Sequence, residues 1–234
     1  MGRKLSVGDT LGEAFSIYRA QAGVLLPVAF WLFLVVAIVD GLIGQDVALL
    51  PILAVVSTVA GTLYEGMVVG LVRDVQDGRR DSSMGELVRA ALPVLLPLIG
   101  AGLLSGLAIG VGFVLLVVPG LYLMTIWAVI APAIVVERTG VLAAFSRSRE
   151  LVRGNGWPVC GAVVVALLIS VSGALVLGSI AEGIADGPLI RIVFSAIGST
   201  VTAPVLALVV AVVYYRLQAI ETPPVPLAGD SATT

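Results

Sequence analysis

The sequence contains no histidine and only one cysteine, Cys160. Without histidine, the chain has no imidazole general base and no histidine-containing metal site. A single cysteine excludes an internal disulfide. The chain also lacks a Walker loop, a GxSxG nucleophile elbow, an HExxH zinc motif and carboxylate pairs at metal-ligand spacing. The sequence therefore predicts no enzyme, no metal site and no cofactor.

Charged residues are also scarce. Only 12% of the 234 residues are charged, whereas a soluble globular domain carries roughly 25%. Hydrophobic residues make up 59% of the chain and the mean hydropathy is +1.12, so most of the surface must face lipid rather than water. The net charge is −2 and the basic residues are few and scattered, which argues against a nucleic-acid partner.

Six apolar runs approach the roughly 20 helical residues that cross a bilayer core about 30 Å thick. The fourth run is short, and Arg191 interrupts the start of the sixth. Runs such as VLALVVAVV lack the period-2 alternation of a membrane barrel. The sequence predicts an all-α six-helix transmembrane bundle within residues 1–218 and a disordered cytoplasmic tail over residues 219–234. The predicted spans are 24–43, 48–72, 92–117, 121–136, 158–181 and 189–215.

Positive charge is concentrated on one side of these spans. Of the 13 basic residues, 12 fall before span one, after span six, or between spans two and three and spans four and five. Only Arg191 falls on the other side, together with Asp40, Asp46, Glu182 and Asp186. Because Lys and Arg are enriched in cytoplasmic connections, the sequence predicts a multi-pass protein with both termini in the cytoplasm.

Three of the cytoplasmic stretches place apolar residues on one helical face. They precede spans one, three and five, and we expect them to form amphipathic helices that lie in the membrane interface. Thr10 with Glu13, and Ser83 with Glu86, have the spacing of capping boxes. The pattern favours a threefold repeat of interfacial helix plus hairpin, although unrelated amphipathic loops would give the same pattern. The faces comprise Leu11, Ala14, Phe15, Tyr18 and Ala22; Met84, Leu87, Val88 and Ala91; and Val141, Ala144, Phe145, Ser148 and Val152.

Glu65 is the candidate intramembrane polar site, because it lies inside the second span. A charge at membrane depth costs about 2.5–3.5 kcal/mol on insertion scales, so such residues usually face a partner or a water-filled cavity. Two interpretations stay open. Glu65 contacts a headgroup, a proton or a cation, or it is a protonated or Arg-paired residue with a structural role.

Glycines at four-residue spacing occur in two spans. They are Gly66 and Gly70 in span two and Gly102, Gly106 and Gly110 in span three. Glycine lets helix backbones approach closely in lipid, so helix packing is the expected role; a pathway along a thin-walled helix is the alternative. Pro119 and Gly120 fall between spans three and four, where proline would end a helix and glycine would permit a reverse turn.

A cluster of arginines beside the inner leaflet forms the candidate site for anionic lipid headgroups. Its members are Arg138, Arg147, Arg149 and Arg153. Basic residues near such a surface attract anionic lipid by on the order of 1 kcal/mol each. The alternative is that these arginines only enforce the topology.

Two stretches resemble the glycerophosphoryl diester phosphodiesterase membrane-domain family. They are VVPGLYLMTIWAVIAPAIVVE with AAFSRSRELVRGNGW, and the opening LSVGDTLGEAFSIYRAQAG. The matching residues are Pro119, Gly120, Tyr122, Glu137, Ser148, Leu151, Val152, Gly154 and Trp157. The resemblance implies a six-helix domain of a bacterial plasma membrane and an association with glycerophospholipid. It implies no hydrolase activity, because the family's hydrolase is a separate barrel domain.

Three functional hypotheses follow from these features. The first is a non-enzymatic membrane module that binds or organises lipids or a partner membrane protein. The second is a small transporter or channel that uses Glu65 and the glycine-rich third span. The third, an intramembrane enzyme acting on a phosphodiester, is the least favoured, because the sequence offers neither a nucleophile–base pair nor a metal site.

Overall fold

The structure is a computed structural model that describes residues 5–43, 46–77, 85, 92–184 and 187–221. Within these residues every regular element is a helix. The α-helices are α1 (Val7–Ile43), α2 (Leu50–Gln76), α4 (Leu95–Leu115), α5 (Val117–Ile126), α6 (Ile130–Glu137), α7 (Val141–Val152), α8 (Gly156–Ile184) and α9 (Pro188–Glu221). Two 3₁₀ turns, Val47–Leu49 and Leu92–Val94, precede α2 and α4.

The six predicted spans are confirmed as helices long and apolar enough to cross a membrane. They are Val7–Ile43, Val47–Gln76, Leu92–Leu115, Val117–Glu137, Gly156–Ile180 and Ile192–Glu221. The protein is therefore a multi-pass membrane protein. The interfacial helix predicted before span three, with Ser83, Met84, Glu86, Leu87, Val88 and Ala91, lies outside the described residues.

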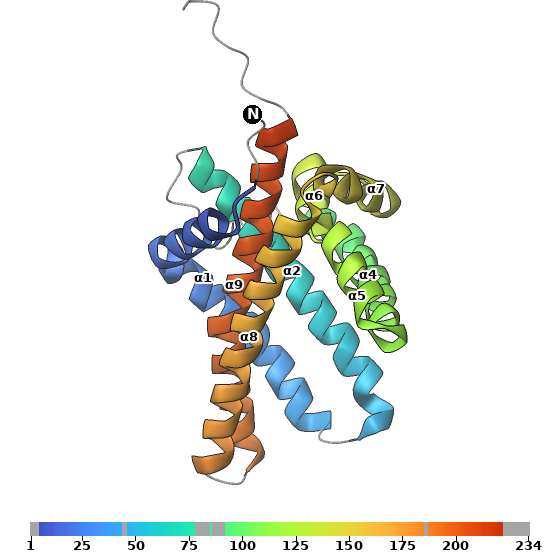
Figure 1. Ribbon diagram of the computed structural model, residues 1–234. Coiled ribbons are helices and arrows are strands. Elements are labelled where there is room, and N and C mark those ends of the chain that lie inside the picture. The colour runs from blue at the N-terminus through green and yellow to red at the C-terminus, as the bar shows by residue number, and fades with distance from the viewer. Residues whose placement is uncertain (1–4, 44–45, 78–84, 86–91, 185–186, 222–234) are drawn as a thin grey trace, which may run out of the picture.

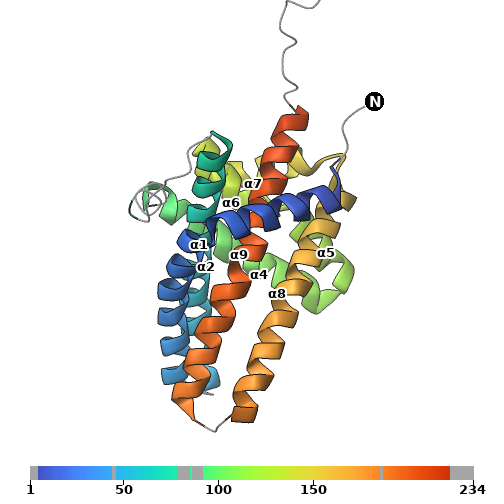
Figure 2. The same ribbon diagram turned by 90° about the vertical axis from the view of Figure 1, so that its left-hand side faces the viewer.

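The interfacial stretch predicted before span one is the first part of α1 rather than a separate helix. α1 runs unbroken for 37 residues with Pro27 inside it, and its first part crosses α9 before the helix turns along the bundle (Figure 2). The predicted capping box of Thr10 and Glu13 is wrong. Ser6 caps the helix instead, because its hydroxyl oxygen accepts the Asp9 N–H at 3.4 Å.

The helices share one densely packed end, which we name the α7 end (Figure 1). It carries α7, the first part of α1, the last turns of α9 and both ends of the described chain. The opposite end, which we name the loop end, carries the last turns of α1 and α8 and the first turns of α2 and α9. The main core lies toward the α7 end, where residues 207–214 of α9 are all buried. A helix buried all round must be apolar all round, as this segment is apart from Tyr214.

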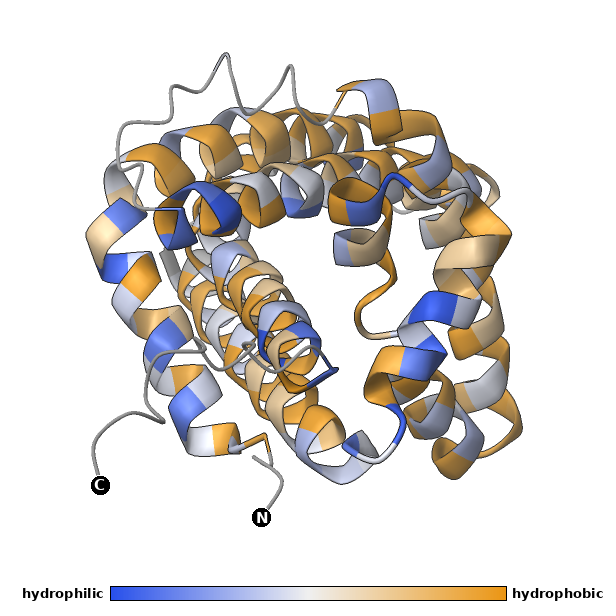
Figure 3. Cartoon of the chain, turned by 90° about the horizontal axis from the view of Figure 1, so that it is seen from above, coloured by the Kyte–Doolittle hydropathy of each residue, from blue (hydrophilic) through white to orange (hydrophobic). Residues whose placement is uncertain are grey.

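Seen from above, the helices are mostly apolar, and hydrophilic residues gather on the turns nearest the viewer (Figure 3). α9 packs chiefly against α1 and α8 and also contacts α2, α6 and α7. Pro204 lies inside α9. In the turn before it, Tyr18 donates to the Val201 carbonyl at 3.2 Å and Ser170 donates to the Thr202 carbonyl at 3.2 Å. Hydroxyl groups of α1 and α8 thus bond to the backbone of α9 in the turn before this proline.

The fourth span is broken into α5 and α6 at residues 127–129. Pro132 falls in the first turn of α6, where a missing N–H costs nothing. The hydroxyl of Ser148, fully buried on α7, donates to the Ile126 carbonyl at 2.9 Å and accepts the Val129 N–H at 3.3 Å. One serine therefore supplies partners to both sides of the break.

The reversal between α4 and α5 occurs at Leu116, which is extended with φ −163° and ψ 148°. The turn predicted at Pro119 and Gly120 is therefore misplaced, since both residues lie inside α5. Proline is tolerated in a first helical turn, and Gly120 serves close packing: a Cβ atom there would lie 2.5 Å from the ring of Phe113. The first three residues of the predicted tail, 219–221, belong to α9, and residues 222–234 lie outside the described residues.

Candidate functional site

Arg147 on α7 joins three helices at the α7 end. Its Nε donates to both carboxylate oxygens of Glu137, at the end of α6, at 2.9 Å. Its Nη1 and Nη2 donate to the two oxygens of Glu221, in the last turn of α9, at 2.9 and 2.6 Å. Tyr214 donates its hydroxyl proton to Glu137 at 2.9 Å, and Gln218 donates to the Tyr214 hydroxyl oxygen. We name Arg147, Glu137, Glu221 and Tyr214 the arginine clamp.

The clamp changes the role expected of Arg147. Two carboxylates hold its guanidinium, and the hydrogen bonds to Glu221 and Glu137 raise the pKa of Arg147 above its usual value. The predicted headgroup contact therefore acts as an internal tie between helices. Sequence reasoning missed this because Glu221 lies 74 residues away along the chain, and because Glu137 was considered only as a motif residue.

Arg149 and Arg153, the next two arginines of the predicted headgroup site, lack such a tie within the described part of the chain. Both are exposed and make no ion pair with a described residue. They line a cavity of about 470 Å³ between α5, the end of α7 and the start of α8, which we name the α7 cavity. Tyr122, Ile126 and Glu150 also line it. The spacing i, i+4 places the two arginines on one side of α7.

The α7 cavity carries one net positive charge, from two arginines and Glu150. Its wall continues through Gly154 to Gly156, where α8 begins. Gly154 has a φ of +87°, a backbone conformation that glycine adopts without steric strain. Beside it, Trp157 is 90% exposed, as expected for an aromatic ring at the level of lipid headgroups. The arrangement suits an anionic group whose carrier is partly apolar.

Arg138 does not join Arg149 and Arg153. It follows α6 with φ +52° and ψ +38°, a left-handed conformation at the C-cap. Its side chain is exposed and does not line the α7 cavity. The structure therefore divides the four predicted arginines into one clamped residue, two cavity residues and one separate residue.

Glu65 lies in α2 and is only partly exposed. No described residue forms a hydrogen bond or an ion pair with it. Glu65 follows Thr62 by three residues, so the two share a face of α2. The methyl group of Thr62 on this face lies against Gly102 of α4. The interpretation of Glu65 as a residue paired with a nearby arginine is therefore not supported among the described residues.

The glycines of the third span divide into two groups. A Cβ atom at Gly102 would lie 2.6 Å from the Thr62 methyl carbon, so this residue permits close contact between α4 and α2. A Cβ atom at Gly106 or Gly110 would meet nothing within 4 Å. Gly66 is buried in α2, and Gly70 is partly buried. Packing among the described residues thus explains Gly102 but neither Gly106 nor Gly110.

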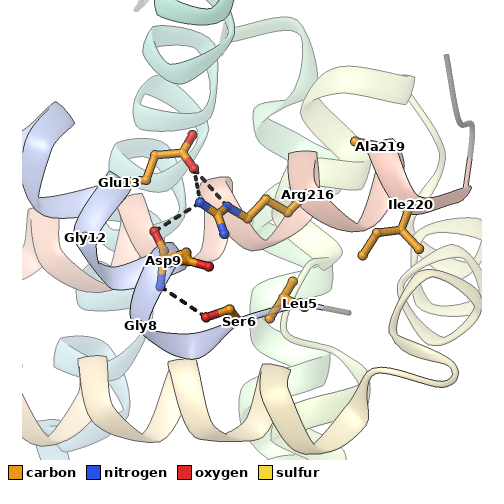
Figure 4. Close-up of a pocket in the computed structure, with 9 residues that line it drawn as sticks. All are labelled: Leu5, Ser6, Gly8, Asp9, Gly12, Glu13, Arg216, Ala219 and Ile220. Carbon is orange, nitrogen blue, oxygen red and sulfur yellow. Dashed lines mark hydrogen bonds and ion pairs between the residues drawn. The ribbon is translucent and has the colours of Figure 1, made fainter. Parts of the chain in front are cut away.

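A second and larger cavity lies where the first part of α1 crosses the last turns of α9. Its volume is about 780 Å³, and we name it the α1–α9 cavity. Arg216 reaches from α9 toward α1, with Glu13 on one side and Asp9 on the other (Figure 4). Arg216 donates to Glu13 Oε2 from Nε at 2.8 Å and from Nη2 at 2.7 Å. Sequence reasoning missed this site, because the two segments are 203 residues apart.

Metal chemistry finds no support in the residues that the structure describes. They contain no group of three His, Cys, Asp or Glu side chains that could hold an ion. Cys160 is a free, partly buried thiol near the start of α8. Comparisons with known proteins add no relative: no family model, no curated protein and no solved structure matches the chain. The resemblance to the phosphodiesterase membrane-domain family therefore stays a prediction.

Proposed function

We propose that this protein is a non-enzymatic membrane module that binds the headgroup of an anionic phospholipid in the α7 cavity. Arg149 and Arg153 are the residues that contact the phosphate. The observation that carries the proposal is that both arginines line one cavity at one end of the bundle and lack an internal carboxylate partner among the described residues.

Two further features support this function. The exposed Tyr122 lines the cavity, and the exposed Trp157 directly follows the lining residue Gly156 in the sequence; amphipathic rings of this kind sit at the headgroup level of a bilayer. Each arginine near an anionic surface contributes on the order of 1 kcal/mol of attraction. Arg147 by contrast is neutralised by Glu137 and Glu221, so α7 offers two cationic side chains to a ligand rather than three.

The proposed orientation places the α7 end in the cytoplasm of a bacterial cell, with the bundle in the plasma membrane. The described basic residues Arg19, Arg73, Arg138 and Arg216 belong to elements that meet at this end, as do the three arginines of the α7 region. The positive-inside rule favours this arrangement, and the resemblance to a bacterial membrane-domain family agrees with it.

The test is native mass spectrometry of the purified protein in nanodiscs that contain phosphatidylglycerol and phosphatidylcholine with identical acyl chains. We expect bound phosphatidylglycerol to be enriched in the wild type, and the Arg149→Gln/Arg153→Gln variant to lose about tenfold of that preference, roughly 1.4 kcal/mol. The matched control is Arg19→Gln/Arg138→Gln. It removes two exposed charges outside the cavity and should keep the preference.

An equal loss in both double variants would contradict a defined site, because it would show a general attraction to positive charge. The absence of any enrichment in the wild type would contradict the function itself. In either case attention would turn to a protein partner, the other ligand of the membrane-module hypothesis.

A second candidate function, a small transporter or channel, rests on Glu65. This carboxyl group lies in a candidate span, is partly buried and has no hydrogen-bond partner among the described residues. Proteoliposomes loaded with a pH-sensitive dye would report proton or cation flux. We expect Glu65→Gln to abolish such a flux, while Asp40→Asn, near the loop end of α1, should leave it unchanged. Normal flux with Glu65→Gln would contradict this function.

A further inference from the structure

The α1–α9 cavity contains acidic and basic side chains whose hydrogen-bonding atoms are only partly satisfied within the fold. The Asp9 carboxylate makes no hydrogen bond or ion pair with a described residue, because the contacts of Asp9 use only its backbone N–H and carbonyl. Glu13 accepts from Arg216 with Oε2 alone, which leaves Oε1 without a donor. On the cationic side, Nη1 of Arg216 donates to no described residue, since Nε and Nη2 make all its hydrogen bonds.

These unused groups match one class of ligand. A primary ammonium has three N–H donors and requires acceptors, and Asp9 and Glu13 supply carboxylate oxygens for it. A phosphate requires donors, and Arg216 Nη1 supplies them. The cavity carries one net negative charge from Asp9, Glu13 and Arg216, so a purely anionic ligand is disfavoured. A ligand with an ammonium and a phosphate a few atoms apart uses both sides at once.

We propose that the α1–α9 cavity binds a phosphoethanolamine headgroup of a membrane phospholipid, with its ammonium on Asp9 and its phosphate on Arg216. The volume of about 780 Å³ lies within the usual range of about 300–1,000 Å³ for small-ligand sites. Leu5 and Ile220 form an apolar part of the wall, which suits the glycerol and the first methylene groups of a lipid. Gly8 and Gly12 form part of the α1 side of the cavity, and no described side chain lies within 4 Å of a Cβ built at either.

A lipid, rather than a soluble amine, is the ligand that the position of the cavity favours. The cavity lies at the α7 end, where the first part of α1 crosses α9 at one end of the transmembrane bundle. A helix that crosses the end of a bundle with an apolar face lies at the depth of lipid headgroups. This inference does not depend on the α7 cavity, which differs in its charge and in every lining residue.

The test compares two lipids that differ only in the ammonium. Nanodiscs with equal amounts of phosphatidylethanolamine and phosphatidylcholine, with identical acyl chains, are analysed by native mass spectrometry. The trimethylammonium of phosphatidylcholine carries no N–H donor, so we expect the wild type to retain phosphatidylethanolamine about tenfold more often. Asp9→Asn should reduce the ratio to near one. Asp77→Asn, an exposed carboxylate in a weak 3.9 Å pair with Arg73, should leave the ratio unchanged.

Several results distinguish this inference from the proposed function. A wild-type ratio near one would overturn the inference without any variant, and so would an Asp9→Asn protein that binds lipid with its preference intact. If Asp77→Asn lowers the ratio as much as Asp9→Asn does, the preference comes from surface charge and the site is wrong. The Arg149→Gln/Arg153→Gln variant should keep its preference for phosphatidylethanolamine, while it loses its preference for phosphatidylglycerol.

Discussion

The two halves of the bundle are packed in different ways. In the half toward the α7 end, α8 buries Val159, Ala162, Val163 and Ala166 almost completely. In the half toward the loop end, the same helix exposes Leu168, Leu175 and Val176 by 59% or more. α2 shows the same division, because Ile52 and Val55 near its start are exposed while Val68, Val69 and Val72 are buried.

This difference shows what holds a membrane bundle together. Lipid tails are as apolar as leucine, so apolar side chains gain little from leaving lipid for a neighbouring helix. Helices pack closely where polar groups need partners or where small residues permit contact. The arginine clamp, Ser148 at the α5–α6 break and Arg216 with Glu13 all lie in the tightly packed half. The loop-end half is instead open to acyl chains.

We expect the largest change in the free energy of unfolding when the same substitution is made in the two halves of α8 and the results are compared. Ala166 is fully buried in the main core, whereas Ala174 is exposed. We expect Ala166→Leu to lower the free energy of unfolding by about 3 kcal/mol, because three extra carbon atoms have no space. Ala174→Leu should change it by less than about 0.5 kcal/mol. Unfolding by SDS in mixed micelles measures both, and similar losses would contradict the division.

The second effect concerns the arginine clamp. Arg147→Gln removes the charge-assisted hydrogen bonds to Glu137 and Glu221, and each side chain is partly exposed. We expect a loss of about 2 kcal/mol in the free energy of unfolding, since hydrogen bonds to charged groups contribute roughly 1.5–3 kcal/mol. Arg19→Gln, an exposed arginine of α1 with no described partner, is the control. Equal stability of the two variants would show that the clamp is not a stabilising tie.

A third and smaller effect tests Ser148 against its neighbour on the same helix. Ser148→Ala leaves the Ile126 carbonyl and the Val129 N–H without their side-chain partner. We expect a loss of about 1 kcal/mol from these buried unsatisfied groups and faster hydrogen exchange of the Val129 amide. Ser146→Ala, an exposed position of α7, should alter neither quantity. Unchanged exchange at Val129 in the Ser148 variant would contradict the role of this hydroxyl.

Hydropathy was sufficient to predict all six spans, even the short fourth run and the sixth run that Arg191 interrupts, because apolar residues dominate each of them. The features that sequence reasoning missed depend on contacts between distant residues. Leu11 and Tyr18 marked an amphipathic helix correctly, yet no signal indicated that it continues through Pro27 into the first span. The helix break at residues 127–129 was equally hidden, because its partner Ser148 lies 22 residues from Ile126 along the chain.

The candidate site was only partly predicted, because its contacts also join residues that are distant in the sequence. Charge and position identified Arg149 and Arg153 as cationic residues near the interface, and both line the α7 cavity. The same criteria selected Arg147, because a sequence does not show which carboxylate meets which arginine. The α1–α9 cavity had no sequence signal, since Asp9 and Glu13 read as ordinary residues of a helix start and Arg216 as a topological charge.

The last prediction concerns two glycines at four-residue spacing in α4, with an expected effect no larger than that of Ser148→Ala. The Thr62 methyl group cannot move easily away from Gly102, because the Thr62 hydroxyl donates to the Thr58 carbonyl at 2.8 Å. Gly102→Ala should therefore separate α4 from α2 and lower the free energy of unfolding by about 1 kcal/mol, even though alanine favours a helix. Gly106→Ala meets open space and should be neutral or stabilising by about 0.4–1 kcal/mol. A clear loss with Gly106→Ala would mean that Gly106 packs against something other than the described residues, which leave the space beside it open.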